Sequence, residues 1–330
     1  MIDNQLIDTY NRHLNYLRVS VTDRCNLNCC YCEPVKTMLK LSHEEILSYE
    51  EVLRLIRIGI GLGINKIRIT GGEPLIRKGI YEFLGSMAKL EGLKDVSLTT
   101  NAVLLEENLK HIKNAGIKRI NISLDTLNRE KFRQITGHDR FERVWKSVLR
   151  AHAEGFNPIK LNVVVLPGVN DDELVDLARL SFSFPFHIRF IEYMPIGNNA
   201  LGKTQRISGE TILDRLKNLG TLFAVKNEIT DGPAKRFRFA GAKGEIGLIS
   251  AMSHHFCGQC NRLRLTADGR LRTCLLSDRF EDLKRPLRDG CSDEELAALI
   301  FRAVRHKPSS HRLSTDPNVK VWDSMSSIGG

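Results

Sequence analysis

The sequence predicts an α/β protein: an incomplete (βα)6 TIM-like barrel followed by a smaller C-terminal α+β domain. Short β-rich runs alternate with helical stretches over the first two-thirds, which is typical of parallel βα units. Six such units are fewer than the eight of a closed barrel. The composition then changes near residues 220–235, where hairpin-like runs replace the alternation. We therefore expect one domain over residues 1–225 and a second over residues 226–330.

Six runs rich in β-branched residues are expected as the barrel strands, since such residues favour strands. In chain order they are residues 16–22, 66–70, 96–99, 119–124, 159–166 and 187–192. Three pairs with capping-box spacing predict helix starts between and after them. They are Ser42 with Glu45, Asn170 with Glu173, and Ser292 with Glu295.

The C-terminal part carries three hairpin-like segments, at residues 236–239, 245–250 and 263–273. In the last of them, Asp268 and Gly269 stand between alternating apolar residues, which is a strong hairpin signal. We expect helices after these segments and a compact second domain.

Composition excludes several classes of protein. The 330 residues are 42% hydrophobic and 27% charged, which excludes a disordered or fibrous chain. No apolar run approaches the roughly 18–20 residues of a membrane span, and the N-terminal residues lack the apolar core of a secretory signal. We therefore expect a cytoplasmic protein. The net charge of +10 favours an anionic partner without choosing among nucleic acid, lipid and nucleotide.

Three cysteines near the N-terminus, Cys25, Cys29 and Cys32, have the spacing C-x3-C-x2-C. Three thiolates on one short loop suit an iron–sulfur cube and leave one iron without a protein ligand. The alternatives are a zinc site or surplus reactive thiols. Cys30, which interrupts the spacing, is expected to be a small buried apolar residue rather than a ligand.

A second group, Cys257, Cys260 and Cys274, lies more than two hundred residues further on. Folding the hairpin at Asp268 brings Cys274 back beside Cys260, so one metal centre can use all three sulfurs. Spacing alone does not choose between zinc, with Cys291 as a fourth ligand, and an iron–sulfur cluster.

Polar motifs follow the predicted strands. In order they are Cys25, Gly71–Pro74, Thr99–Asn101, Ser123 with Asp125, and Met194. Because active sites of parallel α/β proteins lie at the carboxyl ends of strands, these segments should converge on one face.

Alternation along the strands indicates a basic interior. Arg18, Arg68 and Lys160 stand opposite the apolar residues that helices would cover, and Arg189 is placed similarly on the sixth strand. Any one of them could be a rim residue with a solvated tip. Four on different strands instead predict a wet cavity that holds an anion, because unpaired buried charge is costly.

The first cysteine group with Tyr31, followed by Gly71-Gly72-Glu73-Pro74, resembles the radical S-adenosylmethionine (SAM) superfamily. The second cysteine group, Arg262 with Arg264, and the terminal Ser-Met-Ser-Ser-Ile-Gly-Gly narrow this resemblance. From about Leu17 to Gly330 the chain is similar to the GTP 3′,8-cyclase family of molybdenum cofactor biosynthesis. It departs from that family at Ala102, where glycine is common, and in a short loop at residues 33–41.

The resemblance implies two 4Fe–4S clusters, one in each cysteine group, with SAM bound at the first cluster and the second facing the guanine. The residues implied to contact SAM are Tyr31, Gly72, Ser123 and Met194. Those expected to bind GTP are Arg18, Arg68, Thr99, Lys160 and Arg189, together with Arg262 and Arg264, which project beside the second group and would also serve catalysis.

The resemblance also implies a reaction. A 5′-deoxyadenosyl radical from SAM takes hydrogen from C3′ of GTP, C3′ bonds to C8, and reduction gives (8S)-3′,8-cyclo-7,8-dihydroguanosine 5′-triphosphate. The implied partners are an electron donor such as flavodoxin or ferredoxin, cyclic pyranopterin monophosphate synthase as product acceptor, and a second copy in a homodimer. Neither membrane nor nucleic acid is expected as a partner.

The last two residues, Gly329 and Gly330, are expected to enter the GTP cavity and to bond an inward arginine. Residues without side chains fit where a narrow channel admits only backbone.

Two rival functions remain at this point. One is another radical SAM enzyme with an auxiliary cluster, acting on a peptide; the basic interior favours a triphosphate instead. The other is a zinc-stabilised nucleic-acid-binding protein. The sequence shows no basic helix with interleaved aromatic residues, which such a protein would be expected to have.

Overall fold

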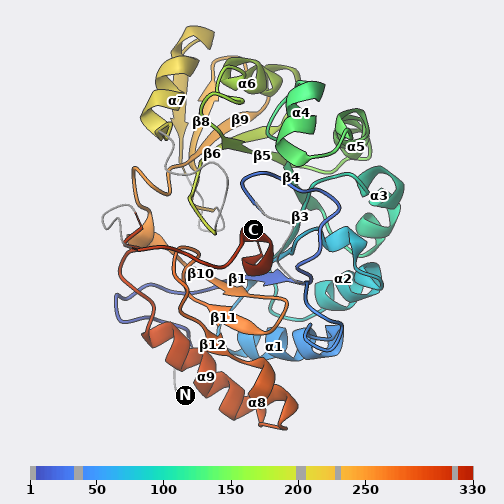
Figure 1. Cartoon of the computed structure of the whole chain (residues 1–330), viewed down its shortest axis with the longest axis vertical. Helices are drawn as coiled ribbons and strands as arrows, with labels where there is room; N and C mark the ends of the chain where they lie inside the picture. Colours follow the sequence, from blue (N-terminus) through green and yellow to red (C-terminus); the bar gives the residue numbers. More distant parts are fainter. Residues whose placement is uncertain (1–4, 33–39, 198–205, 227–231, 314–318, 330) are drawn as a thin grey trace.

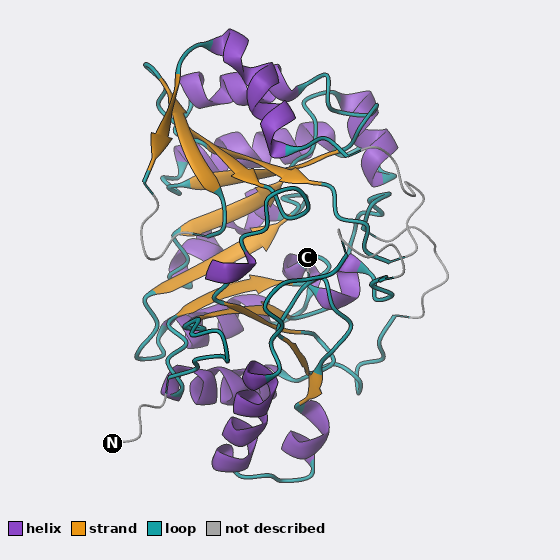
Figure 2. Ribbon diagram, turned by 90° about the vertical axis from the view of Figure 1, so that its left-hand side faces the viewer, coloured by secondary structure: helices purple, strands orange, loops and turns teal. Residues whose placement is uncertain are grey.

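The computed structural model describes residues 5–32, 40–197, 206–226, 232–313 and 319–329. Its frame is one curved sheet of twelve strands with helices along its outer side (Figures 1 and 2). The six expected barrel strands are present, parallel and adjacent in chain order. They are β1 (Tyr16–Ser20), β2 (Lys66–Thr70), β3 (Asp95–Thr100), β4 (Arg119–Ser123), β5 (Ile159–Val165) and β6 (His187–Glu192).

Strands from the C-terminal part extend this sheet at both edges. β10 (Arg262–Leu265) pairs in parallel with β1, and β9 (Glu245–Ile249) pairs in parallel with β6. Two antiparallel strands then flank each side: β11 (Arg270–Arg272) and β12 (Glu281–Asp282) beyond β10, and β8 (Lys235–Phe239) and β7 (Leu222–Val225) beyond β9. The predicted incomplete barrel with a smaller C-terminal part is confirmed. The proposed boundary at residue 225 stays a prediction, and the sheet continues across it.

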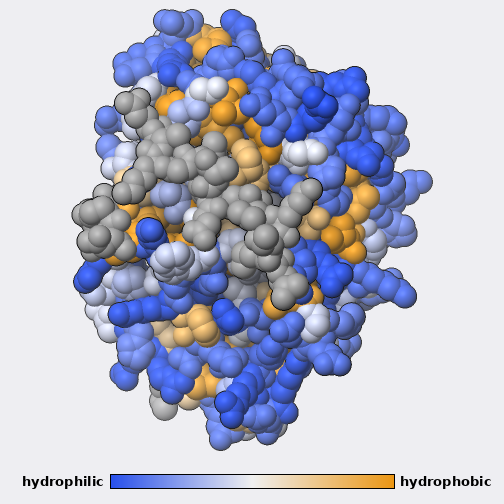
Figure 3. All heavy atoms as spheres, viewed as in Figure 1, coloured by the Kyte–Doolittle hydropathy of each residue, from blue (hydrophilic) through white to orange (hydrophobic). Residues whose placement is uncertain are grey.

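The helices of the described ranges cover the apolar side of the sheet, except the last of them, which lies on the inner side of the sheet. In chain order they are α1 (Tyr49–Gly61), α2 (Ile80–Ala88), α3 (Leu105–Asn114), α4 (Arg129–Thr136), α5 (Phe141–Ala153), α6 (Leu174–Ser183), α7 (Gly209–Leu216), α8 (Lys284–Arg288), α9 (Asp293–Arg305) and α10 (Met325–Ile328). Short 3-10 turns occupy Pro74–Ile76, Lys217–Leu219 and Cys257–Gln259. The strand residues that face these helices, such as Val19, Ile67 and Ile120, are fully buried. On the face seen in Figure 3, hydrophilic residues cover most of the helices, with apolar residues between them. None of the helices in the described ranges is long and apolar enough to cross a membrane.

Two of the three expected helix starts are wrong. α1 begins after Ser48, whose hydroxyl accepts from Glu51 N at 3.2 Å while Glu51 accepts from Ser48 N at 2.6 Å. Ser42 and Glu45 make the same reciprocal bonds, yet they close only a turn, because Leu47 N is bonded to Ala267 O.

Asn170 does not cap a helix either. Its side chain accepts from Leu166 N and donates to Asp125 O and Val164 O, so it holds the loop after β5, and α6 starts at Leu174. The third start is confirmed: Ser292 and Glu295 form a capping box before α9.

The hairpin predicted at Asp268 is also confirmed. β10 and β11 pair antiparallel, with Arg264 opposite Arg272, and Gly269 turns the chain at φ +81°. The hairpin therefore places β10, with Arg262 and Arg264, directly beside β1, and β11, with Arg270 and Arg272, one strand further out.

Candidate active site

A cavity of about 220 Å³ lies inside the curve of the sheet, at the carboxyl ends of the parallel strands. Every parallel strand, or the loop after it, contributes to its wall. The contributors include Arg18 from β1, Arg68 from β2, Thr99 from β3, Ser123 from β4, Asn162 from β5, Arg189 from β6, Ile249 from β9, and Arg262 and Arg264 from β10. The predicted convergence of these segments on one face is confirmed.

Cys25, Cys29 and Cys32 all open onto this cavity. Two backbone hydrogen bonds, Asn28 N to Thr136 O and Cys30 N to Ile135 O, each 2.9 Å, hold their loop against the end of α4. Cys30 does not line the cavity in the described structure. It packs beside Ile135 and Tyr193, as expected of a small apolar residue, but it is half-buried rather than buried.

Cys25, Cys29 and Cys32 are half-buried residues. Burial, followed by the neighbouring Cys32, raises the pKa of Cys29 well above its ordinary value, and burial also raises the pKa of Cys25. Because metal ligands must be thiolates, loading this group with metal releases protons.

The Gly71-Gly72-Glu73 segment clamps the cysteine loop. A Cβ on Gly72 would lie 2.1 Å from Arg24 O, so the missing side chain lets two backbone segments meet beside Cys25. Gly72 N donates to Thr22 O at 2.6 Å and Glu73 N to Arg24 O at 2.8 Å. On this side of Gly72, the missing side chain therefore serves the contact between two segments of the chain itself.

A hydrogen-bond relay links this clamp to the first group. Glu73 is fully buried, accepts from Asn101 N at 2.7 Å, and burial raises its pKa to about 7. The Asn101 side chain donates to Asn26 at 2.7 Å and to Cys25 Sγ at 3.6 Å. Ala102 follows at φ +63°, a left-handed backbone that explains why glycine is common there in the resembling family.

Tyr31 is oriented by Asp125. Its hydroxyl donates to Asp125 Oδ2 at 2.6 Å, and Asp125 Oδ1 accepts from Val164 N at 2.7 Å. Burial raises the pKa of Asp125 to about 6. Both side chains line the cavity. Gly72, Ser123 and Met194 line it as well, so all four residues implied to contact SAM lie in its wall.

Positive charge also lines this cavity. Five guanidinium groups line it: those of Arg18, Arg68, Arg189, Arg262 and Arg264. These cations affect the buried Tyr16. Burial raises the pKa of Tyr16, but the effect of the nearby cations, Arg68 first, is larger, so the pKa is lowered. Burial lowers the pKa of Arg18 to about 9, with Arg68 and Arg262 adding to the effect. Such a concentration of guanidinium groups suits a polyanion.

Thr99 and Lys160 lie differently from the other predicted contacts. The Thr99 hydroxyl is buried at the wall and has no hydrogen-bond partner in the described structure, so it is available to a ligand. Lys160 is buried on the same strand face as Asn162, but it is not among the residues of the cavity wall in the described ranges. It lies one step lower in the barrel, opposite His187 of β6.

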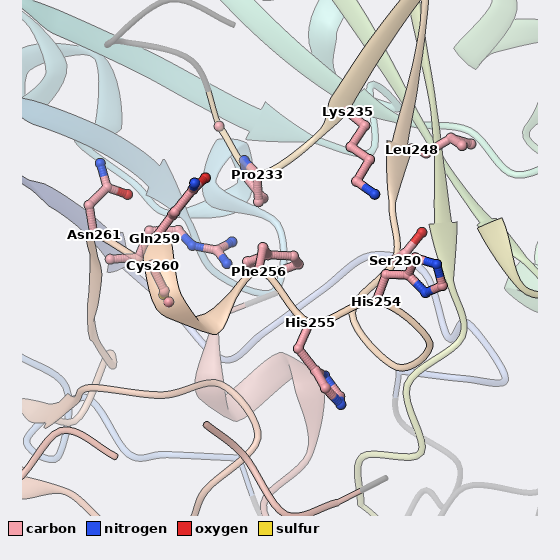
Figure 4. Close-up of a pocket in the computed structure, with 13 residues that line it drawn as sticks. Pro233, Lys235, Leu248, Ser250, His254, His255, Phe256, Gln259, Cys260 and Asn261 are labelled. Atoms are coloured by element: carbon pink, nitrogen blue, oxygen red, sulfur yellow. The ribbon is translucent and has the colours of Figure 1, made fainter. Parts of the chain in front are cut away.

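The second cysteine group borders a neighbouring pocket of about 580 Å³. Cys260 lines that pocket, and Arg262, Gly232 and Pro233 line both spaces. Figure 4 shows Cys260 and Asn261 on one side of it and Lys235 and Ser250 on the other. Arg262 therefore connects the second group to the arginine-lined cavity.

One thiol of the second group, that of Cys260, differs from those of the first group. Burial raises the pKa of Cys260, but Arg262 and Lys307 outweigh this and lower it to about 6. The pKa of Cys274 is raised by burial.

Donor spacing separates the metal alternatives. A zinc ion with Zn–S bonds of about 2.3 Å holds its sulfurs within about 4 Å of one another. In the part of the chain that the structure describes, neither cysteine group gathers its donors within 4.8 Å. The group that does, His255, Cys257 and His311, shares one cysteine with the second group. Cys291 packs near α8 and α9 against the main core, whereas Cys274 packs against a different core cluster.

The C-terminal tail reaches the site. Gly329 O accepts from Arg264 Nη1 at 2.6 Å, and a Cβ on Gly329 would lie 2.7 Å from Ser20 Cβ of β1. Met325 of α10 lines the cavity, and Figure 1 shows α10 beside β1. The expected bond between the tail and an inward arginine is thus present at Gly329, while Gly330 and most of the loop at residues 33–41 lie outside the described residues.

The sequence placed Glu73, Asn101 and Asp125 at the strand ends that face the cavity, but assigned them no role. It missed Tyr16 and Lys307 altogether. Lys307 carried no usable signal, since it contacts the second group only through the packing of α9.

Family models match both parts of the chain. Residues 19–181 match the Radical SAM superfamily, and residues 186–313 match Molybdenum Cofactor Synthesis C. Among solved structures, Streptococcus suis SuiB bound to S-adenosylmethionine is similar, with a TM-score of 0.61 at 14% identity over 84% of this chain. This chain spans 65% of that one, and the likeness concerns the fold.

The fold and the cysteine group at its strand ends define a radical SAM enzyme, a class that works with a 4Fe–4S cluster and SAM. Two relatives are similar over nearly the whole chain. GTP 3′,8-cyclase of Thermodesulfovibrio yellowstonii is 48% identical, covering 98% of this chain and 99% of that protein. The corresponding protein of Moorella thermoacetica is 46% identical with the same coverage. The chain belongs to the GTP 3′,8-cyclase family.

Proposed function

We propose that this chain converts GTP to (8S)-3′,8-cyclo-7,8-dihydroguanosine 5′-triphosphate, the first step of molybdenum cofactor biosynthesis. Family membership supports the reaction. The observation that carries it is one cavity lined both by Cys25, Cys29 and Cys32 and by five arginines. A peptide-modifying enzyme of the same fold has no need for that charge.

The residues fit the groups that this reaction requires. Cys25, Cys29 and Cys32 would hold one 4Fe–4S cluster with SAM beside it, and Cys257, Cys260 and Cys274 would hold a second. Thiol donors suit iron–sulfur clusters, and the open spacing within each group suits a cluster better than a single ion. When bound, SAM and its cluster supply the one-electron chemistry that removes hydrogen from C3′ of the ribose.

The protein's own task is to bind and orient. Arg18, Arg68 and Arg189 would bind the triphosphate, because guanidinium groups bind phosphate oxygens in bidentate fashion. The unpartnered Thr99 hydroxyl would bond the substrate. Arg262 and Arg264 would hold the purine end near the second cysteine group, and Lys160 would contribute charge from below the cavity wall.

Tyr31, Gly72, Ser123 and Met194 would bind SAM on the side of the cavity occupied by the first cysteine group. Asp125 would fix the Tyr31 ring through the 2.6 Å hydrogen bond. The tail, bonded to Arg264, would complete the cavity and exclude water during the radical step.

The same proposal includes the chain's partners. A one-electron donor such as flavodoxin or ferredoxin would reduce the clusters, and cyclic pyranopterin monophosphate synthase would take the product. We also propose a homodimer and a cytoplasmic location, where reducing conditions keep cysteines from forming disulfides. The arginines face an enclosed cavity rather than an open surface, which supports a nucleotide over a nucleic acid.

Anaerobic incubation of the reconstituted chain with GTP, SAM and dithionite tests the proposal. The product should have the mass of GTP but a different chromatographic retention, because one hydrogen atom leaves C3′ and one electron and one proton are regained. ATP in place of GTP should give no such isomer. Unchanged GTP, with both clusters loaded and SAM cleaved, would refute the assigned substrate.

A further inference from the structure

Lys307, two residues beyond the end of α9, is buried beside the second cysteine group, with 3% of its surface exposed. Its ammonium nitrogen contacts three acceptors: Cys260 Sγ at 3.7 Å, Arg262 O at 3.1 Å, and Thr273 O. Lys307 belongs to none of the sequence motifs described above, and it is not among the described residues that line the substrate cavity.

With a cluster bound, the acceptors determine the charge state of Lys307. Both carbonyl oxygens can only accept, and so can Cys260 Sγ when it is a thiolate ligand of the cluster. Three acceptors require three N–H groups, which a protonated lysine has and a neutral amine lacks. Lys307 is therefore a buried cation whose three donors are directed at the cysteine-bearing segments.

The contacts lie where they can set the position of the sulfurs. Arg262 starts β10, two residues after Cys260, and Thr273 directly precedes Cys274. One side chain thus fixes the backbone next to two of the three cysteines.

The residues after Lys307 complete this arrangement. Arg12 donates to Cys257 O at 2.7 Å and to Pro308 O at 2.7 Å. The segment that begins at Lys307 therefore contacts two of the cysteine segments directly and is joined to the third through Arg12. α9 holds this segment in place, since its capping box and its buried face fix the helix against β11 and β12.

We propose that Lys307 is a positioning residue of the second cysteine group: its ammonium places Cys260 and Cys274 and makes the cluster they hold easier to reduce. This inference rests on the second cluster of the proposed function. Reduction adds one negative charge to a cluster, and a cation near a ligand sulfur stabilises the reduced form. Removing the cation should therefore shift the midpoint potential to more negative values.

The test uses the full chain with Cys25→Ala, Cys29→Ala and Cys32→Ala, so that iron and spectra report the second cluster alone. In this background, Lys307→Met removes the charge and the donors at nearly unchanged size. After anaerobic reconstitution, an EPR-monitored redox titration should show a more negative midpoint than in the parent chain. Lys307→Arg, which keeps a cation with several donors, should stay nearer the parent value.

Lys113→Met is the matched control, because Lys113 also donates to a backbone carbonyl, that of Glu154 at 2.9 Å, but lies on α3 away from the cysteines. Its midpoint should equal that of the parent. An iron-loaded Lys307→Met chain with the parent midpoint would overturn the inference.

If Lys307→Met takes up no iron, Lys307→Gln and Lys307→Arg are compared at equal iron content. Equal midpoints in these two chains would also overturn the role of the charge. A parent chain that binds zinc in place of iron would instead refute the second cluster, and the inference with it. The readout is therefore separate from GTP turnover.

Discussion

The two cysteine groups present the same ligands in opposite electrostatic surroundings. Near the first group stand an amide and two buried carboxyls, those of Asn101, Glu73 and Asp125, and burial raises the pKa of its thiols. Near the second stand two cations, Arg262 and Lys307, and the pKa of Cys260 falls to about 6.

This difference teaches how one chain can give two similar clusters different tasks. A cluster held among carboxyl groups gives up an electron more readily than one held among cations, because the cations stabilise the reduced form. We therefore assign electron delivery to the first group. The second group, joined to the basic cavity through Arg262, is suited to hold an anionic substrate.

The largest expected effects come from removing each group in turn. Changing Cys25, Cys29 and Cys32 to Ala should abolish SAM cleavage and lower the iron from about eight atoms per chain to about four. Changing Cys257, Cys260 and Cys274 to Ala should also halve the iron, but SAM cleavage should persist while GTP conversion stops. Iron analysis and detection of 5′-deoxyadenosine measure both outcomes.

A zinc ion at the second group would break the comparison. Zinc held by His255, Cys257 and His311 would be lost in His311→Ala but retained in Cys274→Ala. If both groups hold iron–sulfur clusters, Cys274→Ala should instead lose metal, namely half of the iron.

The tail should have the next largest effect. Deleting Gly329 and Gly330 should leave iron content and SAM binding intact while product formation collapses, because Arg264 loses its 2.6 Å bond to Gly329 O. Gly329→Ala should act in the same direction through a clash with Ser20 and a left-handed backbone that costs about 1–2 kcal/mol in alanine.

Ser20→Gly offers a matched test of that clash. Added to Gly329→Ala, it removes the side chain that the new methyl group meets, so part of the product formation should return. A deletion chain that cyclises GTP at the full rate would show that the tail has no role in the reaction.

Charge in the cavity is tested next. Arg68→Met should weaken GTP binding roughly ten- to a hundredfold, since a charge-assisted hydrogen bond contributes about 1.5–3 kcal/mol. Arg143→Met, which breaks a surface pair with Glu107, is the control and should bind as the parent does. Lys160→Ala should have a smaller effect than Arg68→Met, because Lys160 lies below the cavity wall. Equilibrium dialysis with GTP on the SAM-free chain measures all three.

A pH-dependent difference between the two groups should be visible in the cluster-free chain. With its pKa lowered to about 6, Cys260 is mostly thiolate at pH 7, and its alkylation should rise between about pH 5 and pH 7. Cys29, whose pKa is raised by burial and by Cys32, should stay protonated and react only at alkaline pH. Mass spectrometry of iodoacetamide-treated chains gives both profiles, and coincident profiles would argue against the contrast.

The smallest expected effect concerns the scaffold of the first group. Ala102→Gly should raise the free energy of unfolding by up to about 1 kcal/mol, because relief of the left-handed alanine is partly offset by the greater freedom of glycine in the unfolded chain. Thermal unfolding checks this, and iron content should not change. A lower melting temperature would show that the methyl group of Ala102, which is fully buried, contributes more by packing than its backbone costs.

The sequence could predict the six strands, their inward arginines and the hairpin at Asp268, because each depends on local periodicity. It could not predict that β9 and β10 join the two edges of the barrel, since pairing between distant segments leaves no local pattern. The alternation of polar and apolar residues predicted which face of β5 Lys160 lies on, but not its position along the barrel axis. Asn162, two residues further along β5, lines the cavity instead. The start of α1 was wrong because two S-x-x-E boxes stand six residues apart, and a contact with Ala267 decides between them.

The most direct test of the central claim uses GTP deuterated at C3′. The reconstituted chain is incubated anaerobically with this substrate, SAM and dithionite, and the 5′-deoxyadenosine and the nucleotide are analysed by mass spectrometry. If the first cysteine group and the arginine-lined cavity act on one substrate, deuterium should appear in 5′-deoxyadenosine together with a cyclised triphosphate. Unlabelled 5′-deoxyadenosine, formed while GTP remains intact, would contradict the account.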